Sequence, residues 1–93
     1  MALQFAWDPG KAAANLSRHG VSFEEASTAF GDPHSITIPD PEHSQSEQRF
    51  ILIGASLQGL LVIVSHAERG DTIRIISARR ATRTERRTYE EAW

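Results

Sequence analysis

Three apolar segments in the second half of the chain constrain the fold most, because each has the residue types of a β-strand and only short connections separate them. The segments span residues 49–56, 60–66 and 72–79. The connections at 57–59 and 67–71 are short enough to be hairpin loops. The sequence therefore predicts an antiparallel β-meander.

Apolar side chains occupy both faces of these segments. A sheet with one face in water alternates apolar and polar residues, whereas these segments contain consecutive apolar residues. The runs are Ile51-Leu52-Ile53, Leu61-Val62-Ile63 and Ile75-Ile76. We expect the meander to be a central sheet with helices on at least one side.

A short strand and a helix are predicted at the start of the chain. Alternating apolar residues indicate the strand at 3–7. Asp8 can cap a helix whose first residue is Pro9, and Gly20 suits the turn that ends it. The residues expected to be buried on this helix are Ala12, Ala13 and Leu16.

The rest of the chain completes an α+β arrangement. A second helix follows the Ser22/Glu25 capping box and ends at 31–33, and a third runs from the Thr82/Glu85 capping box to Trp93. Between them the sequence predicts an edge strand at 35–38 and a loop at 42–48. The order β-α-α-β-β-β-β-α clusters the strands and separates the helices, which predicts an α+β fold. With 93 residues and no linker or repeat, the chain is expected to be a single domain, 1–93.

Several classes of protein are disfavoured by composition. The chain has no cysteine, which excludes disulfides and thiolate metal sites and fits a reducing cytoplasm. Its longest apolar run, residues 60–64, is far shorter than the roughly 20 residues of a membrane span. The first seven residues lack the basic start and apolar stretch of a signal peptide. We expect a cytoplasmic protein that does not associate with membranes.

Positive charge is concentrated at the C-terminal end. The net charge is only −2, but residues 1–68 carry three cations and eight anions, whereas residues 69–93 carry seven arginines and four anions. Nine of the ten cations are arginines. A surface that only needs solubility uses lysine as well, so this choice favours recognition of phosphate or of nucleic-acid bases.

Arg74 lies in the middle of the last predicted strand. A regular pleat places it on one face with Ile76 and Ala78, opposite Ser77. Such an arginine either packs its stem and pairs with a carboxylate, or is presented to bind a phosphate. Both interpretations remain open from these residues alone.

Five more arginines cluster where the last strand meets the last helix: Arg79, Arg80, Arg83, Arg86 and Arg87. A cation at the start of a helix costs about 0.3–1 kcal/mol unless an anion is near. Glu90 and Glu91 lie one turn after Arg86 and Arg87, which predicts two ion pairs. The other arginines have only Glu85 nearby, so RNA or an acidic protein is the predicted partner. No motif for duplex DNA is present.

The histidines do not predict a metal site or any cofactor, because none has metal-ligand spacing. His66 ends a strand and is either a general base or a surface residue. The segment containing His43, Glu47 and Arg49 is either the lip of an active site or a solvated loop.

Seven short motifs together resemble one protein family. They are FAWDP at 5–9, NLSRHGVSFEE at 15–25, FGDP at 30–33, HS at 43–44, EQR at 47–49, RIISARR at 74–80 and ERR at 85–87. In this combination they resemble the BrnT toxins of bacterial type II toxin–antitoxin modules. The resemblance implies a RelE-like ribonuclease fold and metal-independent RNA cleavage that stops translation. It also implies a BrnA-like ribbon-helix-helix antitoxin that forms a heterotetramer with the toxin and makes the DNA contacts that repress the operon.

The expected reaction is attack of a ribose 2′-OH on the neighbouring phosphate. It needs a base, an acid and positive charge for the developing dianion. The predicted catalytic residues are Arg74 and Arg79 for charge, with Glu47 or His66 as base. The predicted RNA-binding residues are Arg49, Arg69, Arg80 and Arg83. The alternatives are a non-catalytic basic module that docks an acidic protein or RNA, and a toxin weakened by changes such as Leu60 after Gly59.

Overall fold

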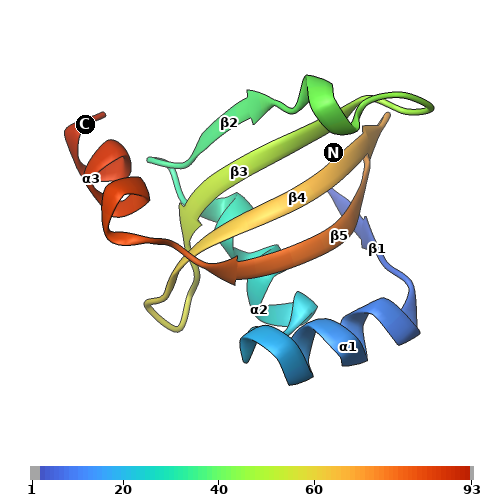
Figure 1. Cartoon of the computed structure of the whole chain (residues 1–93), viewed down its shortest axis with the longest axis horizontal. Coiled ribbons are helices and arrows are strands. Elements are labelled where there is room, and N and C mark those ends of the chain that lie inside the picture. The colour runs from blue at the N-terminus through green and yellow to red at the C-terminus, as the bar shows by residue number, and fades with distance from the viewer. Residues whose placement is uncertain (1–2, 93) are drawn as a thin grey trace.

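A computed structural model, which describes residues 3–92, contains a five-stranded sheet with helices on both faces (Figure 1). Its strands are β1 (Gln4–Ala6), β2 (Ile36–Pro39), β3 (Arg49–Ala55), β4 (Leu61–Arg69) and β5 (Thr72–Arg80). Its helices are α1 (Pro9–His19), α2 (Phe23–Thr28) and α3 (Arg83–Glu91), with 3₁₀ turns η1 (Ala29–Gly31) and η2 (Pro41–His43). The predicted α+β fold and its element order are confirmed. The predicted helix end at Trp93 lies outside the described residues.

The strand order is β1-β5-β4-β3-β2, and three of the four pairings are antiparallel. The meander β3-β4-β5 forms the centre, as predicted, and β2 is an edge strand beside β3. The exception is β1, which pairs in parallel with the start of β5, where Gln4 lies opposite Thr72. The sequence indicated this strand but not its partner.

An irregularity in β5 overturns the regular pleat expected for that strand. Ser65 of β4 lies opposite Ser77, but the next residue, His66, lies opposite Ile75. Ile76 is therefore a β-bulge, an extra residue without a partner in β4. Because directly opposed residues share a face of the sheet, the bulge puts Ala78 on the core face and Ser77 on the other, the reverse of the prediction.

Helix α1 docks on β5 through the Asn15 amide, and of its three predicted apolar residues only Ala12 packs against the core. Leu16 is 51% exposed, and Ala13 is also exposed, whereas Asn15 is buried. The Asn15 side chain donates hydrogen bonds to the carbonyls of Val21 and Ala78 and accepts one from the Ala78 amide, at 2.8–3.1 Å. Because β1 pairs with β5 only as far as Arg74, Ala78 lies on an open stretch of strand edge, and Asn15 satisfies its backbone.

The two faces of the sheet have separate apolar clusters. The larger cluster lies under α1, α2 and η1, and it includes Phe23, Val64 and Ile75. The smaller one forms where Tyr89 of α3 packs on Ile53 and its neighbours. Figure 1 shows α3 at one end of its face, so the other end of that face is not covered by a helix.

None of the helices within residues 3–92 is both long and apolar enough to cross a lipid bilayer.

Candidate active site

Arginines flank the uncovered end of the sheet face that carries α3. Arg49 of β3 lies opposite Ala67 of β4, which in turn lies opposite Arg74 of β5. Residues opposed in this way project on the same side of the sheet. Ala67 is 2% exposed, so neighbouring side chains fill the space above its small side chain.

Glu47 binds the guanidinium groups around that space. Its carboxylate accepts hydrogen bonds from Arg74 and, at 3.2 Å, from Arg69, and it lies 3.7 Å from Nη2 of Arg49. The hydrogen bond from Arg74 is the main reason that the pKa of Glu47 is below its usual value. A single carboxylate thus faces three cations, and the group carries excess positive charge.

Arg49 retains unused hydrogen-bonding capacity. Its Nε atom is buried and has no hydrogen-bond partner among the described residues. A buried donor without an acceptor is energetically unfavourable, at about 1–3 kcal/mol. The donor is covered in the free protein, so it reaches an anion in the site when the Arg49 side chain moves.

A pocket of about 320 Å³ lies beside this group of charges. Ser65 and Ser77, directly opposed on β4 and β5, line it together with Ile51 and the bulged Ile76. The remaining lining residues are Asp40, His43 and Arg49. The pocket therefore joins Arg49 to the turn η2 that precedes β3.

Arg79 lies beyond the serines, toward α3. It is opposed to Ile63, which is four β4 residues from Ala67, so the backbones at Arg79 and Arg74 are separated by roughly 13 Å at about 3.3 Å per residue. Both terminal nitrogens of Arg79 donate to Glu85, at 2.8 and 2.9 Å. These hydrogen bonds are the main reason that the pKa of Glu85 falls to about 2. Glu85 also completes the predicted capping box with Thr82, which anchors the start of α3 beside Arg79.

The predicted ion pairs along α3 are wrong. No ion pair joins Arg86 to Glu90 or Arg87 to Glu91 in the described part of the chain, and all four side chains are exposed. Arg80 and Arg83 are also exposed. These cations are therefore accessible to a polyanion.

His66 does not lie with the arginines. It projects from the opposite face of β4, with 0% exposure, between the ring of Phe30 and the ring of Phe50. Its Nε2 is 2.9 Å from Glu68. A group that solvent cannot reach on the far face is a structural residue of the core, and its placement argues against a role as general base.

His43 does reach the pocket, and its Nδ1 lies 2.9 Å from Oδ2 of Asp40. The His43 side chain is 63% exposed and that of Asp40 is 15% exposed. The sequence had no clear signal for this pair. Its three-residue spacing after Asp40-Pro41 fits one helical turn, but nothing local shows that the turn folds over β3.

The fold and this site define a small α+β protein whose sheet carries clustered arginines on one face, the side chain that can bind phosphate with two parallel hydrogen bonds. The family model for the ribonuclease toxin BrnT of type II toxin–antitoxin systems matches residues 7–85. The chain therefore belongs to the BrnT family of ribonuclease toxins.

A solved structure has the same fold. It is the 1.1 Å crystal structure of the Brucella abortus ribonuclease toxin BrnT, with a TM-score of 0.68 and 20% sequence identity. The alignment covers 88% of this chain and 100% of that one. No protein with a curated description matches this sequence.

Proposed function

We propose that this toxin is a metal-independent endoribonuclease that cleaves mRNA on the open sheet face and so inhibits translation. The observation that carries the proposal is the convergence of Arg49, Arg69 and Arg74 on the single carboxylate of Glu47, beside a pocket. Three cations held by one anion form a site that a phosphate can enter by displacing Glu47.

The arginines have distinct roles in this proposal. The guanidinium of Arg74 stabilises the negative charge that develops on the phosphate, and Arg79 contributes from the other side of the serines. The unused Nε of Arg49 positions the phosphate. Glu47 holds these groups in place in the free protein, and its lowered pKa makes it a weak proton acceptor.

The outer arginines extend the binding surface. Arg69 lies at the hairpin end of β4, while Arg80 and Arg83 lie where β5 leads into α3. An RNA strand that passes over the serines contacts Arg69 at one end and Arg83 at the other, whereas Arg80 is opposed to Val62 of the larger cluster and projects from the other face. We assign stabilisation of the phosphate to the arginines of the open sheet face, which can bind it bidentately.

The reaction we propose ends in a 2′,3′-cyclic phosphate and a free 5′-OH. The decisive experiment incubates purified toxin with an RNA oligonucleotide in excess EDTA and identifies the ends of the products. Defined cleavage with a cyclic phosphate supports the proposal. Binding without cleavage shows instead a non-catalytic basic module, and activity only after metal addition contradicts the metal-independent mechanism.

We also propose the biological setting that the family implies. A toxin of a type II system has an antitoxin. We propose that the antitoxin is BrnA-like, with a ribbon-helix-helix domain, and that the two proteins form a heterotetramer. This complex represses its own operon, and the antitoxin makes the DNA contacts. The toxin acts in the bacterial cytoplasm. Inducible expression with and without the neighbouring gene tests this: the toxin alone arrests growth, and the neighbouring gene restores it.

A further inference from the structure

We propose that His43, oriented by Asp40, is the general base that removes the proton from the ribose 2′-OH. This inference rests on the proposed ribonuclease function and names the group that performs its proton transfer. It starts from the pocket, where His43 and Asp40 lie together with Arg49.

The hydrogen bond between the two side chains determines which nitrogen is free. With Nδ1 at 2.9 Å from the Asp40 carboxylate, the neutral imidazole carries its proton on Nδ1 and donates it to Asp40. Nε2 is then an acceptor, and no described residue bonds to it. A carboxylate that fixes the tautomer of a histidine also stabilises the imidazolium formed after proton transfer.

The turn that carries this pair is fixed to β3. The Asp40 amide donates to the Arg49 carbonyl at 2.9 Å, and the Ser44 hydroxyl accepts from the Arg49 amide at 2.9 Å. The same hydroxyl donates to the Asp40 carbonyl at 2.6 Å. His43 is therefore held beside the arginine that positions the phosphate.

In the proposed reaction, one proton moves from the ribose 2′-OH to His43. Nε2 of His43 takes the 2′-OH proton while the 2′ oxygen forms a bond to phosphorus. The bond from phosphorus to the 5′ oxygen breaks, that oxygen takes a proton from water, and the imidazolium later returns its proton to solvent. The charged groups around His43 are Asp40 and Glu42 in its own turn, Glu47 in the following loop, and Arg49 on β3.

The test compares His43→Ala, His43→Gln and Asp40→Asn with the wild type in single-turnover cleavage of an RNA oligonucleotide with EDTA. We expect His43→Ala and His43→Gln to lower the cleavage rate about 100-fold and to remove the acidic limb of the pH–rate profile, with the RNA Kd changed less than about twofold. Asp40→Asn should lower the rate less. His19→Ala, an exposed histidine on α1, is the control and should cleave normally.

The possible results distinguish a wrong assignment of His43 from a wrong assignment of the ribonuclease function. A His43→Ala variant that cleaves at the wild-type rate with the same pH profile overturns the assignment of the base and leaves the ribonuclease function intact. A wild type that cleaves no RNA overturns the function, and this inference with it.

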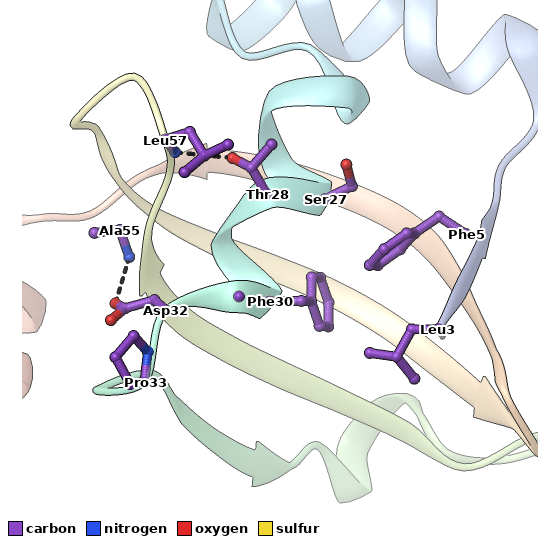
Figure 2. Close-up of a pocket in the computed structure, with 10 residues that line it drawn as sticks. Leu3, Phe5, Ser27, Thr28, Phe30, Asp32, Pro33, Ala55 and Leu57 are labelled. Carbon is purple, nitrogen blue, oxygen red and sulfur yellow. Dashed lines mark hydrogen bonds between the residues drawn. The ribbon is translucent and has the colours of Figure 1, made fainter. Parts of the chain in front are cut away.

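A second, independent inference concerns an apolar groove away from the arginines (Figure 2). Its volume is about 570 Å³. It is lined by Leu3, Phe5, Ser27, Thr28, Phe30, Gly31, Asp32, Pro33, Ala55 and Leu57. Leu3 is 51% exposed and Leu57 is 85% exposed, so two large apolar side chains at this groove face solvent.

The walls of the groove are fixed by hydrogen bonds that Figure 2 shows as dashed lines. The amide of Leu57 donates to the Thr28 hydroxyl at 2.9 Å, and the amide of Ala55 donates to Asp32 at 2.8 Å. The β3–β4 turn is thereby attached to α2 and to the residue after η1. A preformed apolar groove needs little reordering when a partner enters it.

The charge around the groove indicates which partner fits. Among the described residues that line the groove, Asp32 is the only charged one. Glu25, which accepts a hydrogen bond from Ser56 at 2.9 Å, lies beside the same turn. Hydrogen bonds from Tyr89, Ala55 and His34 outweigh partial burial and lower the pKa of Asp32, so it is negative at neutral pH. RNA is repelled by this charge, whereas a peptide with apolar side chains and a flanking Lys or Arg is complementary.

We infer that this groove binds a segment of the antitoxin that has apolar anchors beside a basic residue. The test measures binding of the co-expressed antitoxin to Leu57→Lys, with Leu16→Lys, another exposed leucine outside the groove, as control. We expect Leu57→Lys to weaken binding at least tenfold and to escape neutralisation while it still arrests growth and cleaves RNA. Leu16→Lys should bind as the wild type does. Unchanged antitoxin binding by Leu57→Lys overturns the inference without affecting the ribonuclease function.

Discussion

Arg74 and Arg79 project from the same face of β5 although they are five positions apart, because the bulge at Ile76 shifts the alternation of the strand. In a regular strand, residues an odd number apart project from opposite faces. The bulge thus brings both arginines to the open side of the sheet, with Ser77 between them. β-bulges often re-aim side chains next to active sites.

Loss of the Arg74 guanidinium should abolish activity without unfolding the protein. We expect Arg74→Ala to reduce RNA cleavage about 100-fold or more, because one charged donor at the phosphate is removed. Arg74→Lys should recover little, since an ammonium cannot make a bidentate contact. The melting temperature should fall by less than about 8 °C, because a partly exposed ion pair contributes about 0–1 kcal/mol and 1 kcal/mol corresponds to about 4–8 °C in a domain of this size. Arg18→Ala on α1 is the control, and wild-type toxicity of Arg74→Ala would exclude the role.

The salt dependence of RNA affinity should reveal which of the outer arginines contact RNA phosphates. Each phosphate contact to single-stranded RNA contributes about 0.7 to the slope of log Kd against log salt concentration. We expect Arg83→Ala to lower that slope by about 0.7 and to weaken binding to all sequences alike, whereas Arg80→Ala, on the other face of the sheet, should change it less. Fluorescence anisotropy over a range of KCl concentrations measures the slope. Unchanged slopes in both variants would place the RNA elsewhere.

Replacement of Asn15 should destabilise the fold strongly. Asn15→Ala leaves the amide and the carbonyl of Ala78 without their partners at the edge of β5. We expect a loss of about 2–4 kcal/mol in the free energy of unfolding, measured by urea denaturation. Leu16→Ala, at an exposed neighbour on the same helix, should cost less than about 1 kcal/mol. Similar values for both variants would show that the amide does not dock α1.

Stability should fall in acid through the pair formed by Arg79 and Glu85. The pKa of Glu85 is lowered to about 2 in the folded protein from 4.5, so its contribution is complete above the unfolded value and disappears as the pH falls from 4.5 toward 2. After solvent screening we expect this contribution to be on the order of 1 kcal/mol. Glu85→Gln can still cap α3 but removes the charge, so its stability should depend less on pH in this window. Glu90→Gln is the exposed control and should follow the wild type.

A methyl group at Gly54 should destabilise the fold more than a methyl group at Gly31. At Gly54 an added Cβ would lie 2.9 Å from the carbonyl oxygen of Ala29, because η1 passes close over β3, whereas at Gly31 it would meet no atom within 4 Å. We expect Gly54→Ala to lower the free energy of unfolding by about 1–3 kcal/mol and Gly31→Ala to be nearly neutral. Equal stability of the two variants would show that the backbone relaxes freely.

The elements whose signals are local were predicted well. Alternating and consecutive apolar residues indicated the three central strands, and the capping residues Asp8, Ser22 and Thr82 identified the helix starts that the structure contains. The clustering of arginines toward the C-terminal end was also visible in the sequence. Their division between Glu47 and Glu85 was not, because Glu47 meets Arg74 from a loop 27 residues away.

The histidines illustrate the limit of the sequence best. His66 resembled a general base but is buried on the far face of β4, and His43 was only one residue of a polar loop until that loop folded over β3. Residue type and spacing by themselves determined the strands, the helix starts and the supply of arginines, because these depend on neighbours along the chain; the second helix was predicted to end at 31–33, but α2 ends at Thr28 and the 3₁₀ turn η1 follows it. Tertiary structure alone decided the bulge at Ile76, the pairing of β1 with β5 and the meeting of His43 with Arg49, because each depends on which distant segment lies alongside.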